Sequence, residues 1–544
     1  MTASRRASGI ISLVFLAAVL PPVLTVLGAG FTAADPSAWL AQAGSVLGRP
    51  STWRSVRFSI VQAAVSAAIS VLVAIPGAYL MAHYRFRGRQ IIQSLTLVPF
   101  VMPSLIVILA VIGFYGRAGV LGRLFGGNLT FVYSGVGIVI AHTMFNISVA
   151  LRIIAGGWMQ VDERYRWVSA SLGEGPLGRL FRLHLPLIAP SLVSAGILVF
   201  LYCFVSFGVV LVFGGVRFST IEVRIFQEMF TNLNLTAAGV LAALQLAVAA
   251  LLVGLVQFLT RRTGAGSARS GRRFHTRSWR DLPVPARVLA VVYGAAVGLF
   301  LFAPLLTVVV RAFTWHGGVG LTSFRSLFGG TVGTREVSEI MQSPLADILL
   351  TSLGVATMSA VAGSVLAYIA ARSLRDQLPG SIDTVLTLPL AISGVTLSLG
   401  LRLLFFGIIP EILLIVLAQS IQAFPLVFRN MRGHLRALPS RYLETGRSLG
   451  ARPLHLLWTV EIPVLWRGII NTFAFAFAVS LADFTSVLTI GRGRIVTFPI
   501  AMYRLIGFQS FDVALALGVL YMGFVGLIFF VVDTTSVQRE GEGL

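Results

Sequence analysis

The 544-residue chain is 56% hydrophobic and only 11% charged, and its mean hydropathy is +0.88. Soluble globular proteins carry about 25% charged residues, so this composition excludes an ordinary soluble enzyme and indicates a polytopic membrane protein. A single cysteine excludes a disulfide framework and a cysteine-rich zinc or iron–sulfur site. All 42 basic residues behind the net charge of +22 are arginine. Without lysine the chain has neither a Walker A phosphate loop nor a Schiff-base lysine.

Twelve stretches are long and apolar enough to cross a bilayer, which requires about 20 mostly apolar residues. They fall into two sets of six. The first set lies near residues 10–30, 58–83, 91–113, 134–154, 187–213 and 236–259. The second set lies near residues 287–311, 347–371, 382–406, 409–428, 466–490 and 511–533. Only a few residues around Gly407 separate 382–406 from 409–428, so we expect a helical hairpin with a tight turn there.

The first span follows the basic residues Arg5 and Arg6, so a cleaved signal peptide is the alternative to a membrane span. Its apolar stretch is longer than the usual signal-peptide core of about 7–15 residues, so we expect a retained helix. With both termini in the cytoplasm, most arginines fall on the cytoplasmic side, as the positive-inside rule requires.

Residues 261–280 hold seven arginines and no acidic residue. Such a run can indicate nucleic-acid binding. Because it lies between two spans, we expect a cytoplasmic linker that contacts anionic lipid, and no nucleic-acid partner.

The two sets of spans resemble each other. Ser171–Gly173 and Leu185–Pro186 recur 277 residues later as Ser448–Gly450 and Ile462–Pro463. Earlier in the chain, Ala78–Tyr79 recurs 289 residues later, at 367–368. An even number of spans in each repeat makes the two halves parallel.

A long polar segment follows the fourth span of each set. We call these the first elbow segment (residues 152–186) and the second elbow segment (residues 429–463). We expect two short helices in each, interrupted by Gly173 or Gly450, because glycine permits a positive φ or a close approach of a partner backbone. The proline that closes each motif would then start the next helix. An amphipathic helix on the membrane surface is the alternative, and the duplication at identical spacing argues against it.

At these residues the sequence resembles the permease subunits of bacterial ATP-binding-cassette importers. Their signature is Glu-Ala-Ala-x-x-x-Gly, followed after about nine residues by hydrophobic-x-Leu-Pro. The second elbow segment keeps the acid and the glycine, whereas the first has Trp167-Val168-Ser169 in place of Glu-Ala-Ala. The positions that carry the resemblance are Val168, Ser169, Gly173, Leu185 and Pro186 in the first elbow segment and Glu444, Thr445, Gly446, Gly450, Ile462 and Pro463 in the second.

The resemblance implies that the elbow segments are coupling helices, which dock on two ATPase subunits that hydrolyse the ATP. Glu444 would pair with a basic residue of one ATPase subunit, and Glu163 or Glu174 would replace it in part in the first half. A periplasmic substrate-binding protein would deliver the substrate to this bacterial inner-membrane protein. The resemblance implies no catalytic residue, metal or cofactor in the chain itself.

The resemblance also implies a fold: an all-α polytopic membrane protein with about twelve transmembrane helices, as two parallel six-helix repeats of the type I (MetI-like) permease fold. The expected divisions are 1–54 (first span and periplasmic loop), 55–260 (transmembrane domain, copy 1), 261–285 (arginine-rich linker), 286–345 (seventh span and periplasmic loop), 346–534 (transmembrane domain, copy 2) and 535–544 (cytoplasmic tail).

A fused permease with two such loops is typical of the thiamine and ferric-iron branch of these importers. The segments 114–121, 141–146, 206–215, 219–227 and 480–488 look most like thiamine permeases. The resemblance therefore implies thiamine or its phosphates as the substrate, with ferric iron as the alternative.

Polar side chains within the spans are candidates for the translocation pathway, since burying them in hydrocarbon is costly. Hydrogen bonding between helices is the alternative explanation for each of them. Asp483 would suit a cationic substrate such as thiamine or a ferric ion. The candidates are His142, Asn146, Tyr202, Ser206, Gln419, Gln422 and Asp483. We also expect an amphipathic periplasmic helix over residues 220–230, either as a gate or simply at the interface.

An ion-gradient-driven secondary transporter with parallel repeats is the main alternative function. It would need several buried ionisable groups as ion couplers, and by sequence Asp483 is nearly alone. An intramembrane enzyme is disfavoured because the chain has no HExxH pair, nucleophile elbow with partners or carboxylate dyad.

Overall fold

The computed structural model describes residues 2–28, 36–96, 98–127, 129–161, 178–215, 217–262, 277–315, 318–332, 334–375, 380–390 and 392–537, with residues 165, 169, 171, 173 and 175 in between. In this part of the chain ten helical segments are long and apolar enough to span a membrane. Two shorter apolar helices, Phe15–Gly28 and Gly394–Phe405, lie on two further expected spans. The prediction of an all-α chain with about twelve apolar spans is therefore confirmed.

The chain forms two compact units that do not follow the order of the sequence. The N-half unit consists of Gly44–Arg224 and Ala243–Arg311, and the C-half unit consists of Met1–Ala43, Ile225–Ala242 and Ala312–Leu544. The first span thus belongs to the C-half unit and the seventh to the N-half unit.

Three long helices of the N-half unit pack against one another: α3 (Pro50–His83), α8 (Gly135–Trp158) and α11 (Leu185–Phe204). Its other elements are β1 (Tyr84–Arg85), α4 (Arg89–Leu95), α5 (Val98–Val101), α6 (Ser104–Tyr115), α7 (Val120–Leu124), η1 (Arg179–His184), α12 (Gly208–Gly214), β2 (Arg277–Ser278), η2 (Trp279–Asp281) and α15 (Val284–Ala312). The strands β1 and β2 pair in parallel. The helices α13 (Ile221–Phe230) and α14 (Leu235–Arg262) contribute residues to both units.

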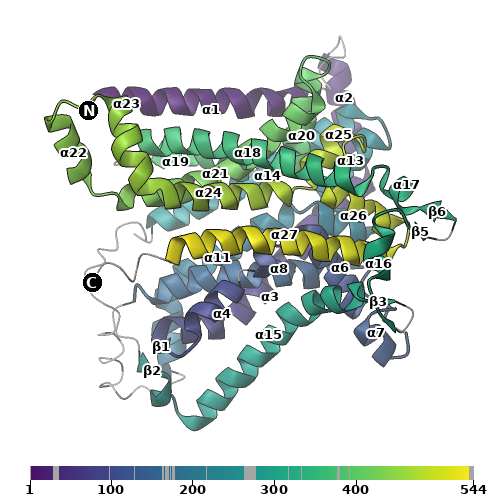
Figure 1. The fold of residues 1–544 in the computed structure, drawn as a ribbon, viewed down its shortest axis with the longest axis horizontal. Coiled ribbons are helices and arrows are strands. Elements are labelled where there is room, and N and C mark those ends of the chain that lie inside the picture. Colours follow the sequence, from purple (N-terminus) through teal and green to yellow (C-terminus); the bar gives the residue numbers. More distant parts are fainter. Residues whose placement is uncertain are drawn as a thin grey trace. The chain divides into compact units, whose positions relative to one another are not determined.

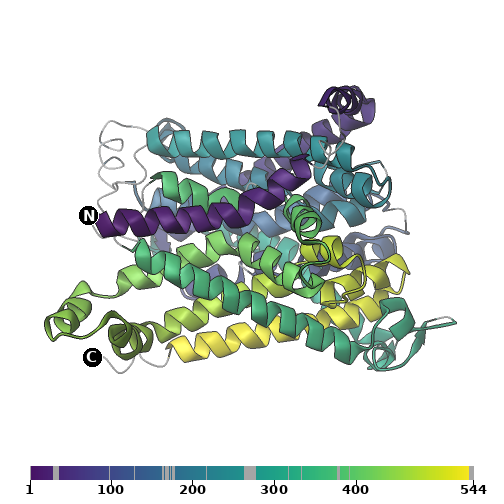
Figure 2. The same ribbon diagram turned by 90° about the horizontal axis from the view of Figure 1, so that it is seen from above.

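The C-half unit repeats this arrangement with α18 (Leu345–Ser373), α21 (Glu411–Ala437) and α24 (Ile462–Leu481), which also pack against one another. The helix α27 (Phe511–Val537) packs on α24 (Figure 2). The remaining elements are α1 (Thr2–Gly28), α2 (Pro36–Leu47, shared with the N-half unit), β3 (Thr314–Trp315), β4 (Gly318–Val319), α16 (Thr322–Ser326), β5 (Thr331–Val332), β6 (Arg335–Glu336), α17 (Val337–Met341), α19 (Gly380–Thr387), η3 (Leu388–Leu390), α20 (Gly394–Phe405), α22 (Ser440–Ser448), α23 (Pro453–Leu456), η4 (Leu457–Glu461), α25 (Thr485–Gly491) and α26 (Phe498–Gly507). The pairs β3–β4 and β5–β6 are antiparallel.

Small side chains form the inner faces of the central helices. In α3 the buried face includes Ser59, Ala63, Ser66 and Ala67, while Val65 points outward and is exposed. Small residues let helix backbones approach closely in a bilayer, where lipid tails are as apolar as the side chains. Small residues on the buried face and large apolar residues on the exposed face are therefore what is expected of a helix such as α3 in contact with lipid.

Each unit also contains a span supplied by the other half of the sequence. In the C-half unit α1 packs against α18, α19 and α20 (Figure 1). A Cβ atom on Gly400 of α20 would clash with the carbonyl oxygen of Pro22 in α1, so only glycine allows this close approach. In the N-half unit the hydroxyl of Tyr293 in α15 donates a 2.6 Å hydrogen bond to the carbonyl oxygen of Val73 in α3.

Four of the expected spans are interrupted and consist of more than one helix. The span 91–113 is divided among α4, α5 and α6, and the span 382–406 among α19, η3 and α20. Prolines lie at these breaks, such as Pro99 in the first turn of α5 and Pro103 at the N-cap of α6, and proline lacks the N–H that would continue the preceding helix. The spans 187–213 and 466–490 break between α11 and α12 and between α24 and α25. The breaks fall at matching places in the two repeats.

Candidate functional site

The second elbow segment is built from two short helices, α22 and α23, as predicted from the sequence. Gly450 lies between them with φ of +80°, a conformation that only glycine adopts without strain. The N–H of Leu449 donates to the carbonyl oxygen of Thr445, and that of Ala451 donates to Gly446, both at 3.0 Å. This bonding closes a helix C-terminus in the Schellman arrangement.

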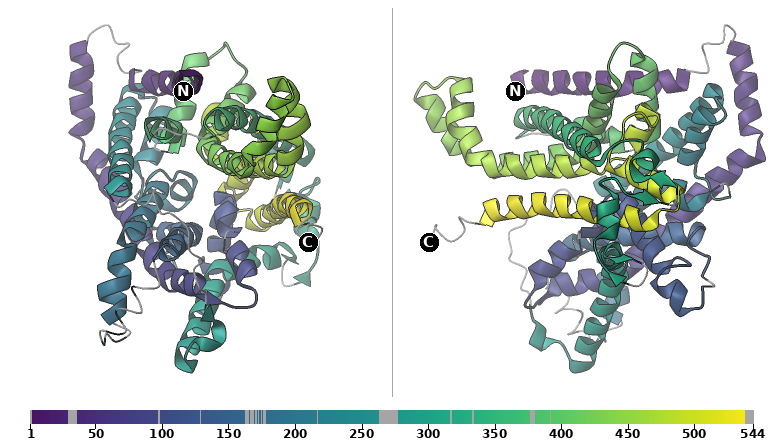
Figure 3. Two further views of the ribbon diagram at one scale, coloured as in Figure 1. Left: turned by 90° about the vertical axis from the view of Figure 1, so that its left-hand side faces the viewer. Right: turned by 45° about the vertical axis from the view of Figure 1, so that its right-hand side comes forward.

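The surface of the second elbow segment is exposed within its unit. Glu444, Thr445 and Gly450 are exposed, and Leu449 has 81% of its surface accessible. Gly446 faces inward, where a Cβ atom would clash with a terminal methyl of Leu456. The two short helices lie beyond the end of α24, as two further views show (Figure 3). The elbow therefore presents an acid and a leucine outward on a backbone fixed by two glycines.

The first elbow segment is described in part. Gly173 has φ of +77°, matching Gly450 at the repeat offset of 277 residues. Ser169 is buried, Leu185 is half-buried and Pro186 is exposed. Val168, like Glu163 and Glu174, lies outside the described residues. The glycine geometry thus recurs in both elbow segments.

The α-helices that follow the elbows begin one residue before the prolines, α11 at Leu185 and α24 at Ile462, so Pro186 and Pro463 lie in the first turn as expected. A π-helical stretch precedes each proline, η1 over Arg179–His184 and η4 over Leu457–Glu461, and it continues directly into α11 or α24. A proline inside an α-helix removes one hydrogen bond and crowds the carbonyl four residues earlier. The wider π turn relieves both problems, and such turns are frequent at functional sites.

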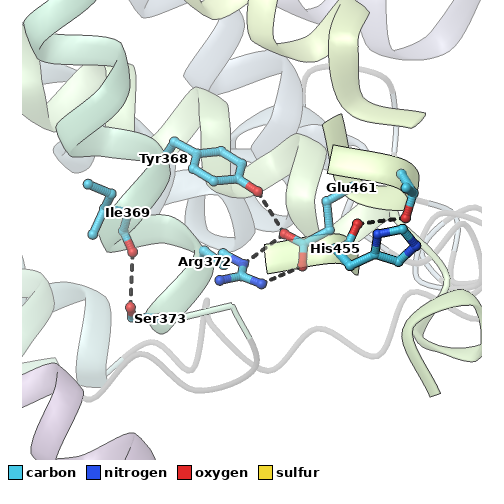
Figure 4. A network of polar contacts seen from close by, with 7 residues as sticks. Tyr368, Ile369, Arg372, Ser373, His455 and Glu461 are labelled. Atoms are coloured by element: carbon cyan, nitrogen blue, oxygen red, sulfur yellow. Dashed lines mark hydrogen bonds and ion pairs between the residues drawn. The ribbon is translucent and has the colours of Figure 1, made fainter. Parts of the chain in front are cut away.

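An ion pair with a buried carboxylate fixes the end of the second elbow segment (Figure 4). The carboxylate of Glu461, which is 3% exposed, accepts 2.8 Å hydrogen bonds from Nε and Nη2 of Arg372. It also accepts a 2.7 Å hydrogen bond from the hydroxyl of Tyr368. Both partners lie on α18, so this bidentate clamp joins the elbow to a central helix of the unit. Sequence reasoning missed the clamp.

The N-half unit replaces this clamp with a cluster of rings. At the repeat offsets Tyr79, His83 and His184 stand where Tyr368, Arg372 and Glu461 stand in the other half. The rings of Tyr79 and His83 lie 4.3 Å apart, and those of His83 and His184 lie 6.0 Å apart. The two elbow segments are therefore anchored at equivalent places by different chemistry.

Two of the four predicted polar residues of the N-half spans, His142 and Asn146, belong to one network. His142 Nδ1 lies 2.9 Å from Oε1 of Gln62, and the Gln62 amide donates to the carbonyl oxygen of Cys203 at 2.8 Å. The amide of Asn146 donates to the carbonyl oxygen of His142 at 2.8 Å and to the Cys203 sulfur at 3.5 Å. Ser206 lies at the break between α11 and α12, where its N–H donates to the carbonyl oxygen of Cys203 at 3.4 Å, and Tyr202 precedes that break.

A second network surrounds Asp483 at the break between α24 and α25. Its Oδ1 accepts hydrogen bonds from the backbone N–H groups of Thr485 and Ser486 at 3.1 and 3.3 Å. Gln419 donates its amide to Asp483 Oδ2 at 3.2 Å and receives a hydrogen bond from the hydroxyl of Ser359. Gln422 donates to the Ser486 hydroxyl at 3.0 Å. The carboxylate therefore holds the start of α25 as a helix cap.

Asp483 is accompanied by other buried ionisable groups, which corrects the expectation that it is nearly alone. Arg402 in α20 is 8% exposed and donates to Glu411 Oε1 at 3.2 Å and to the carbonyl oxygen of Ile490. Glu222 in α13 is fully buried and accepts a 2.6 Å hydrogen bond from Gln245. Arg402 is the single arginine inside the expected span 382–406, so the sequence did contain a signal for this buried group. Each has a partner that stabilises it in place.

The expected helix over residues 220–230 is confirmed as α13, Ile221–Phe230. The hydroxyl of Ser59 in α3 accepts a 2.9 Å hydrogen bond from the N–H of Ile221, which satisfies one donor at the start of the helix.

Comparison with known proteins identifies a repeated domain. The family described as "binding-protein-dependent transport system inner membrane component" matches residues 74–264 and 359–539. Over 560 residues the chain is 28% identical to the thiamine transport system permease protein ThiP of Brucella abortus (strain 2308), covering 99% of this chain and 96% of that protein. It is 29% identical over 502 residues to ThiP of Escherichia coli (strain K12), covering 88% of each chain. It is also 30% identical over 208 residues to the molybdenum transport system permease protein ModB of Mycobacterium bovis (strain ATCC BAA-935 / AF2122/97), covering 38% of this chain and 78% of that protein. The predicted internal repeat is confirmed as two copies of one domain.

Proposed function

Because the chain belongs to the family of binding-protein-dependent transport system inner membrane components, we propose that it forms the translocation pathway of an ATP-binding-cassette importer for thiamine. The chain is a fused, two-copy permease and a multi-pass inner membrane protein. The observation that supports thiamine as the substrate is the similarity to a thiamine permease along 99% of this chain.

In this proposal each copy of the permease domain, 55–260 and 346–534, offers one elbow segment to one of two ATPase subunits. The exposed Glu444 and Leu449 support the docking role, because the fixed backbone at Gly450 presents both to a partner. Both termini and both elbow segments lie in the cytoplasm, and a periplasmic binding protein delivers the substrate to the opposite side. ATP binding and hydrolysis change the contacts of the elbows and so shift the pathway between its two access states.

Thiamine uptake tests the substrate. Cells that lack their own thiamine permease and express this chain with its ATPase and binding protein should accumulate labelled thiamine. Excess unlabelled thiamine should abolish the signal, and excess ferric iron should leave it unchanged. Accumulation of labelled iron without thiamine uptake would contradict the thiamine assignment and leave the permease role intact.

Asp483 is proposed to attract the cationic substrate, and Asp483→Asn separates its charge from its role as a helix cap. Asparagine caps a helix about as well as aspartate, so α25 should keep its start. We expect thiamine uptake to fall about tenfold, which corresponds to about 1.4 kcal/mol, with normal protein amounts in the membrane. Asp483→Ala, which loses both charge and cap, should also reduce the amount of folded protein. Wild-type uptake by Asp483→Asn would reduce the residue to a structural cap.

A further inference from the structure

The N-half unit contains an apolar cavity of about 480 Å³ lined by α3, α4 and α15. Gly77 and Leu80 of α3, Ile92 of α4, and Gly294 and Gly298 of α15 contribute to its wall. Two hydroxyls also line the cavity, but Tyr293 donates to Val73 and Thr96 donates to Gln93. The cavity therefore suits a hydrocarbon occupant.

The length of the cavity fits one leaflet of a bilayer. Its α15 wall extends from Ala290 to Phe302, or about 18 Å at 1.5 Å per residue. One leaflet contributes half of a hydrocarbon core of about 30 Å. A second cavity of about 530 Å³ shares Tyr293 and Val297 with the first, so two neighbouring spaces are present for the two acyl chains of one phospholipid.

Three arginines are sequence neighbours of two aromatic residues that line one end of the cavity. The parallel pairing of β1 with β2 places Arg85 opposite Ser278, beside the start of α15 (Figure 1). Phe86 and Trp279, which follow these two residues, both line the cavity, with ring centroids 5.4 Å apart. Exposed Arg85 and Arg87 flank Phe86, and exposed Arg280 follows Trp279.

The charge at this end is positive. Asp281, the neighbouring acid in the sequence, accepts a 2.9 Å hydrogen bond from the N–H of Ser278 in a capping box. Three arginines against this one carboxylate leave an excess of positive charge. Tryptophan is enriched at the depth of lipid headgroups, and basic pockets between membrane helices bind anionic headgroups.

We propose that this cavity and its arginines form a binding site for an anionic phospholipid. An acyl chain lies along α15 in the cavity, and the phosphate lies among Arg85, Arg87 and Arg280. A soluble anion would leave the apolar cavity unused, and a neutral lipid would leave the arginines without a partner. The site depends on the N-half unit alone and does not rest on the identity of the transported substrate.

Quenching of Trp279 by brominated lipids tests the site in the full-length chain in nanodiscs. Subtracting the spectrum of Trp279→Phe isolates the signal of this tryptophan. At 10 mol% in phosphatidylcholine, brominated phosphatidylglycerol should quench Trp279 at least about threefold more than brominated phosphatidylcholine does at the same fraction. Glycerol phosphate at millimolar concentration should not reverse the quenching, because it lacks the acyl chain.

Two variants test the arginines and the apolar cavity separately. Arg85→Gln with Arg280→Gln should remove the preference for phosphatidylglycerol. Gly298→Leu should fill the cavity and reduce quenching by both lipids, since a Cβ atom there meets nothing within 4 Å. Arg54→Gln with Arg57→Gln, at the opposite end of α3, is the matched control and should quench as wild type does. Equal quenching by the two lipids in the wild-type protein, or an unchanged preference in the first variant, would overturn the proposal.

Discussion

Gly450→Pro should abolish thiamine uptake while the protein still inserts into the membrane in normal amounts. Proline fixes φ near −65°, so it cannot adopt the +80° of Gly450. The Schellman bonding between α22 and α23 would be lost, and Glu444 and Leu449 would leave their places on the elbow. We expect uptake at least about tenfold below wild type and loss of the ATPase stimulation that substrate delivery causes, both measured in proteoliposomes with the ATPase subunits.

Gly407→Pro is the matched control for this prediction. Gly407 also has a positive φ, of +74°, and lies in the turn between α20 and α21, at the other end of α21 from the elbow. The substitution introduces comparable local strain without touching the second elbow segment. Uptake should stay within about twofold of wild type. Equal loss of uptake in both variants would show that strain alone explains the effect and would contradict the docking role.

Breaking the clamp between Glu461 and Arg372 should be the second most damaging change. Arg372→Gln removes a charge and the two guanidinium hydrogen bonds from the buried carboxylate of Glu461, which keeps the hydrogen bond from the Tyr368 hydroxyl. The Arg372 side chain is 38% exposed, so we discount the loss for solvent screening to about 2 kcal/mol. The elbow would then move independently of α18. We expect uptake to fall about tenfold, with ATP hydrolysis continuing in the absence of substrate.

A charge exchange distinguishes a specific pair from general destabilisation. Arg372→Glu combined with Glu461→Arg should recover part of the uptake that either single substitution removes, and thermal unfolding of the purified protein should follow the same order. Asp383→Asn, which removes the exposed ion pair with Arg429 in the same unit, is the control and should change uptake by less than about threefold. A double variant no better than the two singles would contradict a clamp that acts through its charges.

The positions of the spans followed from the sequence because hydrophobic length is a strong constraint in a bilayer. The internal repeat also predicted the elbow glycines, and the positive φ at Gly173 and Gly450 confirms the local geometry that we expected of them. The hydrophobic length of a span and the backbone conformation at a glycine both depend on residues close together in the chain.

The breaks within the spans could not be predicted from hydropathy, because the composition stays apolar through them. Asp483 followed by Thr485 and Ser486 is a helix-start pattern inside an apolar run, and its significance appears only once the carboxylate is seen to accept their N–H groups. The clamp was hidden for another reason. Glu461 and Arg372 are 89 residues apart, and the other half carries histidines at both positions, so the repeat gave no sign of an ion pair.

Disulfide crosslinking at Leu449 tests the central claim most directly, since it asks whether the second elbow contacts an ATPase subunit. The native chain has one cysteine, Cys203, which is buried and should give little background. Leu449→Cys should crosslink to a cysteine in the cleft of the ATPase subunit, and Ile408→Cys, 75% exposed at the opposite end of α21, should not. No crosslink from position 449 in a complex that transports thiamine would contradict the account.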